Sequence, residues 1–540
     1  MATIVAEDLR PDPSPADIRL VITASSLGTL FEWYDFFIYG TLASIIGKTF
    51  VPSDNETVRM VLVWAGFAVG FGFRPFGAAL FGFLGDRLGR KYTFLVTITL
   101  MGIATAGVGL IPPAAQIGLW APGIVIFLRI LQGLALGGEY GGAAIYVAEH
   151  SPPGKAGFYT SFIQACVAGG FILSLVIVLL TKLVVSEAAW AAWAWRFPFV
   201  FSLVLLGVSL WMRLKLSESP VFKAMKEAGE TVKNPIKASF TYPGNLKRLF
   251  VALFGIAAGL TVIWYTALFS TLTFLTTTMR VEETTAQLIV GAGGLMGLFW
   301  FILFGRLSDA VGRKAPIVIG YAATLALLFP IFWVMGSAAN PALTHANMRA
   351  PVVVSGPTCQ YDLTTMVLSQ QQKDKCAQLL DYFSKKGIAY TKETTPVVAV
   401  SIGGDAVTDT SPKGLDAALA ANGYRLDKVR PTPFGVIIIL AAMLVMSALA
   451  GATYGPVAAL LAEMFPPRIR YSSMSIPYHI GTGYFGGFLP LISQLIVAKT
   501  GHPYAGLWYT WIVVAVALVV TLWGLEGAAA PPRVVPADET

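Results

Sequence analysis

The chain has 540 residues, of which 55% are hydrophobic and 13% are charged, and its mean hydropathy is +0.67. Soluble domains carry about 25% charged residues, so this composition excludes a soluble enzyme, a disordered scaffold and a secreted disulfide framework. The formal net charge of +8 comes from short basic clusters between apolar segments, which is typical of membrane-protein loops. The sequence therefore predicts a polytopic membrane protein that binds no nucleic acid.

The transmembrane segments follow from hydropathy taken along the chain. The first 20 residues are polar and Pro-rich, without a basic start and an apolar core, so we expect no cleaved signal peptide. Because about 20 apolar residues cross the hydrocarbon layer as a helix, twelve spans are predicted. They are about 20–48, 59–84, 92–112, 120–148, 158–185, 196–215, 248–278, 285–305, 315–336, 433–463, 472–498 and 504–526.

The distribution of Lys and Arg between alternate loops predicts the orientation. Twenty of these residues lie on the side of the termini and six lie in the opposite short loops. We therefore expect a protein of the inner membrane with both termini in the cytoplasm. The predicted units are a tail (1–19), a six-helix half (20–216), a linker (217–247), helices seven to nine (248–336), an insertion (337–431), helices ten to twelve (432–526) and a tail (527–540).

The insertion is too polar for lipid, because it carries ten basic and eight acidic residues. It should lie outside the cytoplasm and form a small α/β unit, with strands at 352–354 and 397–402 and helices at 373–386 and near 415–421. Cys359 and Cys376 lie in this unit, where the compartment permits a disulfide, and we treat their pairing as a hypothesis.

Two loop patterns each occur twice. They are Gly82-x-x-x-Asp86-Arg87-x-Gly89-Arg90-Lys91 with Gly305-x-x-x-Asp309-x-x-Gly312-Arg313-Lys314, and Ala148-Glu149-x-x-Pro152-Pro153 with Ala462-Glu463-x-x-Pro466-Pro467. The spacing between the two patterns is 63 residues in the first copy and 154 in the second, and the excess of 91 is close to the length of the insertion. The chain thus consists of two similar six-helix halves, an architecture of secondary transporters.

The loop from Gly82 to Lys91, between helices two and three, resembles the signature of the major facilitator superfamily; its second copy is weaker, with Ala310 in place of Arg87. Four further motifs resemble the metabolite:H⁺ symporter family of that superfamily. The further motifs are Gly28-x-x-x-Glu32-Trp33-Tyr34-Asp35-Phe36-x-x-Tyr39-Gly40, Arg74-Pro75-x-Gly77, Arg129-x-x-Gln132-Gly133-x-x-x-Gly137-Gly138-Glu139, and Pro477-Tyr478-His479-Ile480 followed by Phe485-Gly486-Gly487. The resemblance covers both halves and leaves out the insertion. It implies an all-α fold of twelve transmembrane helices and transport by alternating access.

Charged side chains at membrane depth are costly, and the predicted ones concentrate in the N-terminal half. Glu32 and Asp35 share one face of helix one, while Arg129 and Glu139 lie on helix four, whose glycines favour close contact with helix one. We assign these four residues to proton coupling, and the resemblance implies Asp35 and Arg129 as the central pair. The alternative is a permanent salt bridge that only holds helices together.

Two further groups of candidates complete the predicted machinery. The substrate-binding candidates are polar or aromatic residues of both halves: Arg74, Tyr34, Tyr39, Gln132, Tyr146, Gln164, Trp264, Tyr265, Tyr454, Tyr478, His479 and Tyr484. The candidates for a charged cytoplasmic gate are Gly82, Asp86, Arg87, Gly89, Arg90, Asp309, Arg313, Glu149 and Glu463. For each aromatic residue the alternative is packing, and for Arg74 it is a tether between helices one and two.

We therefore expect a monomeric, proton-coupled symporter that imports a small polar metabolite. Because of the intramembrane arginines, the expected substrate is an organic acid anion. No metal-ligand spacing, nucleophile motif or nucleotide loop occurs, so we expect no enzyme activity and no cofactor other than the coupling proton. A symporter of a betaine- or proline-like osmolyte, an exporter, and a transporter-like sensor that uses the insertion remain open alternatives.

Overall fold

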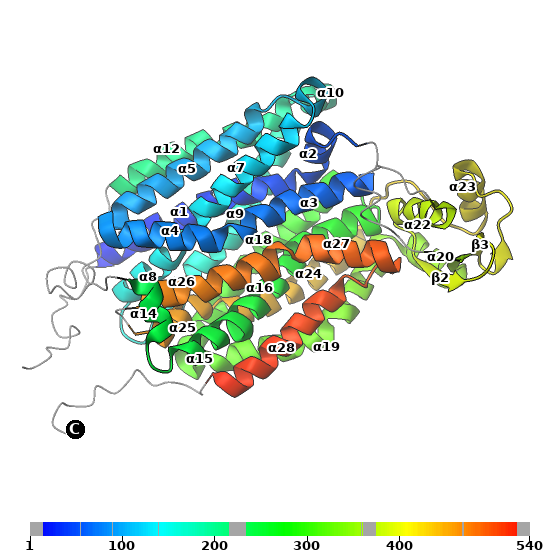
Figure 1. The fold of residues 1–540 in the computed structure, drawn as a ribbon. Helices are drawn as coiled ribbons and strands as arrows, with labels where there is room; N and C mark the ends of the chain where they lie inside the picture. Colours follow the sequence, from blue (N-terminus) through cyan, green and yellow to red (C-terminus); the bar gives the residue numbers. More distant parts are fainter. Residues whose placement is uncertain are drawn as a thin grey trace, which may run out of the picture.

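The computed structural model describes residues 15–53, 56–88, 90–138, 140–214, 234–357, 359, 374–466 and 469–525; for some helical residues it describes only the backbone. Long helices run side by side as one bundle, and a small unit projects from one end of it (Figure 1). We call this the insertion end. The first helix starts and the last helix finishes at the opposite end (Figure 1).

The N-terminal half is entirely helical in its described part. Its elements are α1 (Pro15–Thr41), α2 (Ala43–Phe50), α3 (Glu56–Gly72), α4 (Arg74–Leu88), α5 (Arg90–Leu110), α6 (Ala114–Ile117), α7 (Trp120–Gly137), α8 (Tyr140–His150), α9 (Ala156–Val184), α10 (Glu187–Ala192), η1 (Ala194–Arg196), α11 (Phe197–Val200) and α12 (Ser202–Leu214).

The C-terminal half contains several π-helical turns, which often occur at functional sites. Its elements are α14 (Pro235–Thr241), α15 (Asn245–Phe250), η2 (Val251–Ala257), α16 (Ala258–Tyr265), η3 (Thr266–Ser270), α17 (Thr271–Thr273), η4 (Phe274–Thr278), α18 (Glu283–Val311), α19 (Lys314–Ala339), α24 (Pro433–Tyr454), α25 (Val457–Met464), α26 (Arg470–Ile480), η5 (Gly481–Gly487), α27 (Leu489–Thr500) and α28 (Leu507–Gly524). The π-helical turns are η2, η3, η4 and η5.

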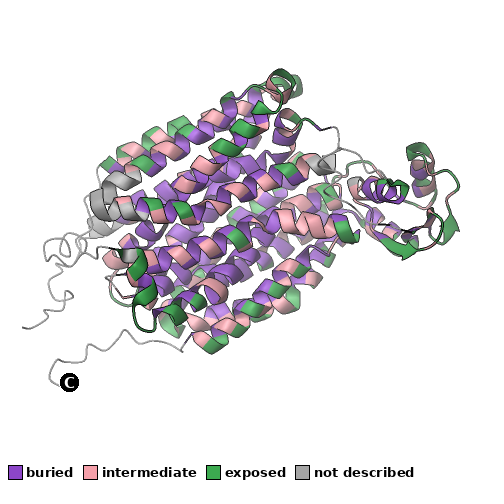
Figure 2. Cartoon of the chain, viewed as in Figure 1, coloured by how far each residue is buried: buried purple, intermediate pink, exposed green. Residues whose placement is uncertain are grey.

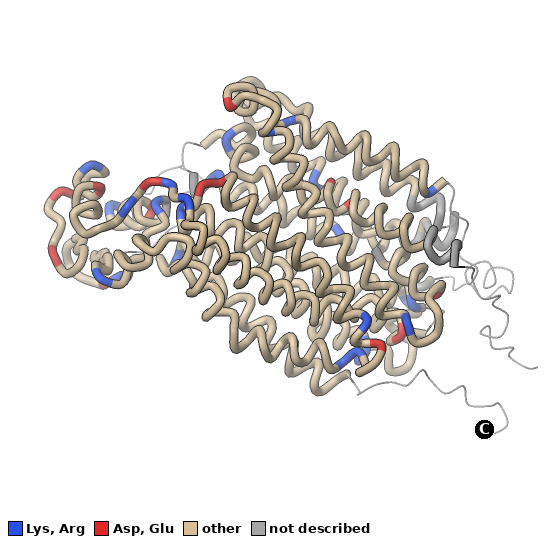
Figure 3. Tube along the Cα trace, turned by 180° about the vertical axis from the view of Figure 1, so that it is seen from behind, with Lys and Arg blue, Asp and Glu red and all other residues tan. Residues whose placement is uncertain are grey.

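Ten stretches of the described chain are long and apolar enough to cross a membrane. They match ten of the twelve predicted spans, and the other two predicted spans correspond to α1 and α5. Buried residues fill the bundle interior, whereas exposed and half-buried residues lie on its outer faces (Figure 2). Charged residues gather at the two ends and on the insertion, and few lie inside (Figure 3). This distribution confirms the expected multi-pass membrane fold.

The two halves meet along two pairs of helices. Helix α9 packs along α18, and α3 and α4 pack against η5 and α26. Helix four of the prediction is interrupted at Gly138, so that α7 and α8 replace a single helix. The glycines of α7 were expected to bring it close to helix one, but they lie against α3 and α4, while α1 packs mainly against α9. Helices one and four do touch, through Arg129 on Phe36 and through α8 along α1, but the α7 glycines do not make this contact. Glycine spacing identifies a close contact and not its partner.

The tightest of these contacts gives a testable prediction. A Cβ atom at Gly133 would lie 1.9 Å from the carbonyl oxygen of Gly70, whereas a Cβ at Gly123 on the same helix meets no heavy atom within 4 Å. Gly133→Ala should therefore force α7 and α3 apart and cost at least the roughly 1–3 kcal/mol of an overpacked core. The melting temperature of the detergent-solubilised protein, measured by fluorescence-detected size exclusion, should fall clearly for Gly133→Ala and stay unchanged for Gly123→Ala. Equal melting temperatures would contradict the contact.

The insertion forms a small α/β unit with its own core. It consists of α20 (Pro341–Arg349), β1 (Val352–Gly356), α22 (Lys375–Lys385), β2 (Tyr390–Thr394), β3 (Ala399–Ile402), β4 (Asp405–Ala406) and α23 (Pro412–Ala421). The strand order is β2-β1-β3-β4, with β1 parallel to β2 and antiparallel to β3. The predicted strands and helices are present, and the sequence analysis missed α20, β2 and β4, of which β2 is polar and largely exposed.

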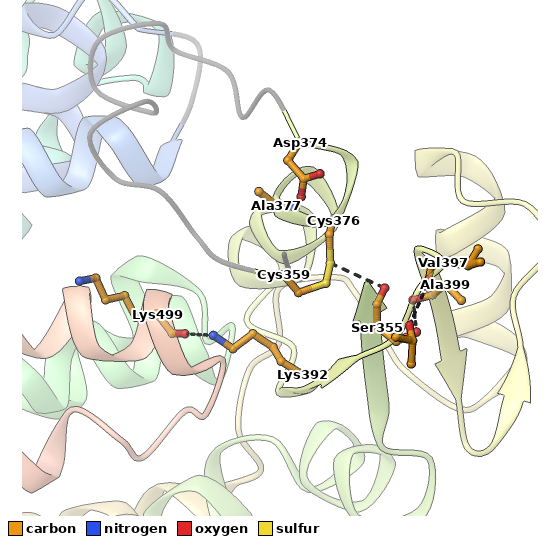
Figure 4. The surroundings of a disulfide bond; sticks show 10 residues. Ser355, Cys359, Asp374, Cys376, Ala377, Lys392, Val397, Ala399 and Lys499 are labelled. Carbon is orange, nitrogen blue, oxygen red and sulfur yellow. Dashed lines mark hydrogen bonds between the residues drawn. A yellow bond between two sulfur atoms is a disulfide. The ribbon is translucent and has the colours of Figure 1, made fainter. Parts of the chain in front are cut away.

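The insertion packs on the C-terminal half, into which it is inserted. Tyr390 donates through its hydroxyl to the carbonyl oxygen of Ala498 at 3.1 Å and through its amide to that of Gly501 at 3.1 Å. Lys392 Nζ donates to the carbonyl oxygen of Lys499 at 2.8 Å (Figure 4). These bonds fix β2 to the outer end of α27.

A second attachment joins the insertion to the end of helix seven. Val429 exchanges backbone hydrogen bonds with the segment around Arg280, whose φ of 56° is unusual for a residue other than glycine. Arg280 Nη1 also donates to the carbonyl oxygen of Lys386 at 3.1 Å. The exposed carboxylate of Glu282 accepts from Arg430, and this hydrogen bond lowers the pKa of Glu282. The insertion is thus held at two helix ends by backbone as well as side-chain bonds.

Cys359 and Cys376 form a disulfide in the structure, with Cα atoms 5.2 Å apart, beside Ser355 at the end of β1 (Figure 4). The bond closes a loop with a sequence separation of 17, for which chain entropy predicts about 3 kcal/mol of stabilisation. We expect C359S/C376S to make the insertion markedly more sensitive to protease while Cys166→Ser does not. Alkylation of the purified protein before and after reduction, read by mass, should reveal two additional thiols; finding all three thiols before reduction would exclude the bond.

Candidate substrate site between the two halves

A small cavity of about 10 Å³ lies between the two halves. This volume is room for about one water molecule, so the site is occluded in this conformation. Its lining comes from seven helical elements of both halves: Trp33, Arg74, Val167, Leu260, Thr261, Trp264, Tyr265, Tyr454, Tyr478 and Thr482. The cavity therefore presents one guanidinium, several aromatic rings and two threonine hydroxyls.

Five of the predicted substrate-binding residues line this cavity, although the one from the N-terminal half is far along the chain from the four of the C-terminal half. They are Arg74, Trp264, Tyr265, Tyr454 and Tyr478. The hydroxyls of Tyr454 and Tyr478 are 2.7 Å apart and share a hydrogen bond. Among the described residues, the Tyr265 hydroxyl and the Trp264 ring nitrogen have no hydrogen-bond partner, so both are available to a substrate.

Arg74 is completely buried, and the carbon at the centre of its guanidinium lies 5.1 Å from the ring centroids of both Trp33 and Phe71. The two rings position the cation by cation–π contacts at the cavity wall. A guanidinium binds a carboxylate through two parallel hydrogen bonds, and Arg74 can offer this recognition without leaving the site.

The other predicted substrate residues do not line the cavity. Tyr34 donates to the carbonyl oxygen of Pro198, and Tyr39 donates to that of Val63, so both hydroxyls point into neighbouring helices. Gln132 donates to Thr105, also within the N-terminal half. The remaining residues of this group are Tyr146, Gln164, Tyr484 and His479. His479 is fully buried next to Tyr478, and neither ring nitrogen has a hydrogen-bond partner among the described residues.

The sequence analysis missed five lining residues: Trp33, Val167, Leu260, Thr261 and Thr482. Trp33 stands inside the helix-one motif, and Thr482 lies three residues after His479 in the helix-eleven motif. Applying the helical periodicity from the motif residues, to find which neighbours share their face, could have included both. Val167, Leu260 and Thr261 carry no sequence signal that separates them from packing residues.

The predicted pair of Asp35 and Arg129 is not formed in this conformation. Arg129 donates through Nη1 to the Phe36 carbonyl oxygen at 3.2 Å and to Gln132 Oε1 at 2.7 Å, and its guanidinium carbon lies 4.0 Å from the Phe36 ring centroid. Asp35 is buried, and its Oδ1 has no hydrogen-bond partner among the described residues. The two residues are linked only indirectly, because Gln132 contacts Thr105 and the Thr105 hydroxyl lies 3.4 Å from the Asp35 carbonyl oxygen.

Glu32, for which the sequence predicted no particular partner, forms an ion pair with Arg213. Its Oε1 lies 2.8 Å from Arg213 Nη2 on α12, and both side chains are buried. Because this pair stays within the N-terminal half, it holds α1 against α12. Glu139 lies outside the described residues.

A layer of aromatic rings covers the cavity toward the insertion end. It is formed by Phe37, Phe71, Phe171, Trp264, Tyr265 and Phe269, and we call it the aromatic layer. Phe37 stacks on Trp264 with ring centroids 5.2 Å apart, and Phe171 lies 4.6 Å from Phe269. Both contacts join the two halves. Beyond the layer, a vestibule of about 500 Å³ is lined by Trp64, Phe269 and polar residues of both halves and of the insertion.

Charged and backbone contacts close the opposite end. The carboxylate of Asp309 accepts hydrogen bonds from the amides of Gly157 and Phe158, each at 2.8 Å, at the N-terminus of α9. Arg313 binds Asp309 at 2.6 Å and Glu463 at 2.8 Å. Because Asp309 lies on α18 and Gly157 on α9, these bonds connect the two halves.

A second connection at this end pairs Glu149 with Arg470 at 3.5 Å, again between the halves. Close by, the Tyr471 hydroxyl donates to the Gly138 carbonyl oxygen at 2.9 Å. The gate candidates of the first copy, Gly82, Asp86, Arg87, Gly89 and Arg90, lie outside the residues whose contacts the structure describes.

Comparisons with known proteins agree with this architecture. A family model for sugar (and other) transporters matches residues 20–248. The chain is 36% identical over 326 residues to a proline/betaine transporter of Salmonella typhimurium, covering 59% of this chain and 65% of that relative's length. It is 34% identical over 333 residues to a shikimate transporter of Escherichia coli, covering 60% of this chain and 74% of that relative.

The fold is also that of the xylose transporter XylE from E. coli in a partially occluded inward open conformation. The TM-score is 0.60 and the sequences are 15% identical, over 95% of this chain and 98% of that one. The chain belongs to the major facilitator superfamily. The matched relatives are named as transporters, and the chain spans slightly less than two thirds of the length of the proline/betaine transporter.

Proposed function

We propose that this protein is a proton-coupled secondary transporter that imports a small organic acid anion by alternating access. The observation that carries this proposal is Arg74, a buried guanidinium held by two aromatic rings at a cavity shared by the two halves. Such a group favours a carboxylate. The basic loops favour a multi-pass inner-membrane protein with both termini in the cytoplasm and the insertion outside.

We propose the proton as the coupling ion, with no other cofactor. We also propose that the transporter works as a monomer. Asp35 is the proposed proton-binding group, because it is a buried carboxyl without a cation partner in the described structure. Closure at the opposite end together with a vestibule at the insertion end corresponds to a state in which substrate approaches from outside. One proton moving across 100 mV supplies about 2.3 kcal/mol, which supports roughly 50-fold accumulation.

A zwitterionic osmolyte is the second candidate, and a specific observation favours it. Five aromatic side chains line the cavity beside Arg74, namely Trp33, Trp264, Tyr265, Tyr454 and Tyr478. Aromatic rings bind quaternary ammonium groups, so the same cavity offers both an anion site and a cation site. The similarity to a proline/betaine transporter supports this candidate, and the similarity to a shikimate transporter supports the first.

Reconstitution into liposomes that contain a pH-sensitive dye tests both candidates. Pools of organic acids, betaine-like osmolytes and sugars are added outside, and acidification of the lumen is recorded. Acidification with an organic-acid pool is the expected result, and acidification with the betaine pool alone would select the second candidate. Loading the vesicles instead and recording efflux tests an exporter. The absence of any response, in protein that remains monodisperse, would contradict transport and favour a sensor.

A further inference from the structure

The insertion does not stand apart from the transport path. The turn after α22 and the start of β2 form one wall of the vestibule, opposite α2 and α3 of the N-terminal half. Helix α22 also contacts α3, while β2 is bonded to the end of α27. A solute that approaches the aromatic layer from this end therefore passes residues of the insertion.

The charges on the vestibule wall are mostly positive. Four basic residues line it, and they come from three different parts of the chain: Lys48 from α2, Arg280 from the end of helix seven, and Lys386 and Lys428 from the insertion. Among the described lining residues, Glu283 is the one acidic side chain. Lys386 Nζ lies 2.7 Å from Asp416 Oδ1, which offsets part of its charge. The wall still keeps an excess of positive charge.

The rest of the wall suits a small hydrophilic solute. Hydroxyl and amide side chains, including Ser44, Thr273 and Gln494, also line the vestibule. A concave surface with one sign of charge raises the local concentration of counter-ions and their association rate by about 10-fold or more at low salt.

We propose that the insertion and α2 together form an access site for anions, in which Lys48, Lys386 and Lys428 concentrate carboxylate-bearing solutes above the aromatic layer. This proposal rests on the proposed transport of an organic acid and assigns the insertion a role in selecting its charge. The central cavity then binds the solute that the vestibule has enriched.

The test measures the electrostatic bias of the vestibule without any transport. A single reporter thiol is placed in the vestibule by Thr273→Cys, in protein that carries Cys166→Ala and keeps its disulfide. It is modified by an anionic sulfonatoethyl and by a cationic trimethylammonioethyl methanethiosulfonate reagent. The control reporter is Ala420→Cys on α23, which is exposed and does not line the vestibule.

At low salt we expect the ratio of anionic to cationic modification rates to be about 10-fold higher at the Thr273→Cys reporter than at the control. At 1 M salt the two ratios should converge, because the Debye length falls to about 3 Å. K386Q and K428Q should each lower the ratio several-fold, and K48Q should do so without touching the insertion. The matched variant K413Q, on α23, should leave it unchanged.

Equal ratios at the two reporters, or a ratio that K48Q, K386Q and K428Q all leave unchanged, would overturn the proposal. The readout separates this inference from the proposed function. Biased modification in protein that moves no organic acid would retain the access site and reject the transport of organic acids. Organic-acid uptake with unbiased modification would do the reverse.

Discussion

Asp309→Asn is expected to open the end of the transporter that lies opposite the insertion and to slow uptake by at least tenfold. The carboxylate accepts hydrogen bonds from two amides at the N-terminus of α9 and from Arg313. The side chain of Asn has one oxygen, which can accept from one of the two amides. The NH₂ group of Asn would then face the N–H of the other amide, and two donors do not form a hydrogen bond. Losing a hydrogen bond to a charged group costs about 1.5–3 kcal/mol, which shifts the closed population roughly 10- to 150-fold.

The measurement combines uptake with the accessibility of a thiol in the closed interface. Ser475 is buried against Gly141 of the other half, so S475C in a Cys166→Ala background should react slowly with N-ethylmaleimide while Asp309 is present. Asp309→Asn should increase this rate at least tenfold.

Glu463→Gln serves as the matched control. It removes a half-exposed partner of Arg313 but leaves the α9 amides capped, and such a pair is worth about 0–1 kcal/mol. Little change in labelling or uptake is therefore expected for this variant. Unchanged labelling and uptake in Asp309→Asn itself would show that these bonds do not control closure.

Asp35→Asn is expected to abolish proton-driven accumulation and to leave substrate exchange intact. Asparagine has nearly the same shape but binds no proton, so the variant can still alternate between its two sides with substrate bound. Because one proton supports roughly 50-fold accumulation per 100 mV, the ratio of inside to outside substrate should fall from tens-fold to about one. Liposomes with an imposed gradient measure accumulation, and isotope exchange without a gradient measures binding and turnover.

The control removes the neighbouring buried carboxyl together with its partner. Glu32→Gln alone would leave the Arg213 cation buried without its carboxylate, so E32Q/R213M is used, which neutralises both groups. This variant should keep proton-driven accumulation. Normal accumulation in Asp35→Asn, or its loss in E32Q/R213M alone, would remove Asp35 from the coupling mechanism.

The class of protein, the division into two halves and the α/β character of the insertion could all be predicted from the amino-acid sequence. Each of these depends on local composition or on repeated spacing: apolar length predicts a span, and the second copies of the Asp86 and Glu149 motifs locate the 337–431 insertion. The five candidates that converge on the cavity were found for a similar reason. A polar or aromatic residue within a long apolar segment requires an explanation wherever the helix happens to pack.

The contacts between these residues, in contrast, became known from the three-dimensional structure. Arg213, near the end of the predicted span 196–215, was not among the candidate residues, yet it pairs with Glu32, 181 residues away in the chain. Arg129 was expected to face Asp35, but aromatic rings and Gln132 hold it elsewhere. The docking of Tyr390 on α27 had no sequence signal either. The partner of a side chain depends on the rotation of each helix about its axis and on contacts between distant segments, and local patterns do not contain this information.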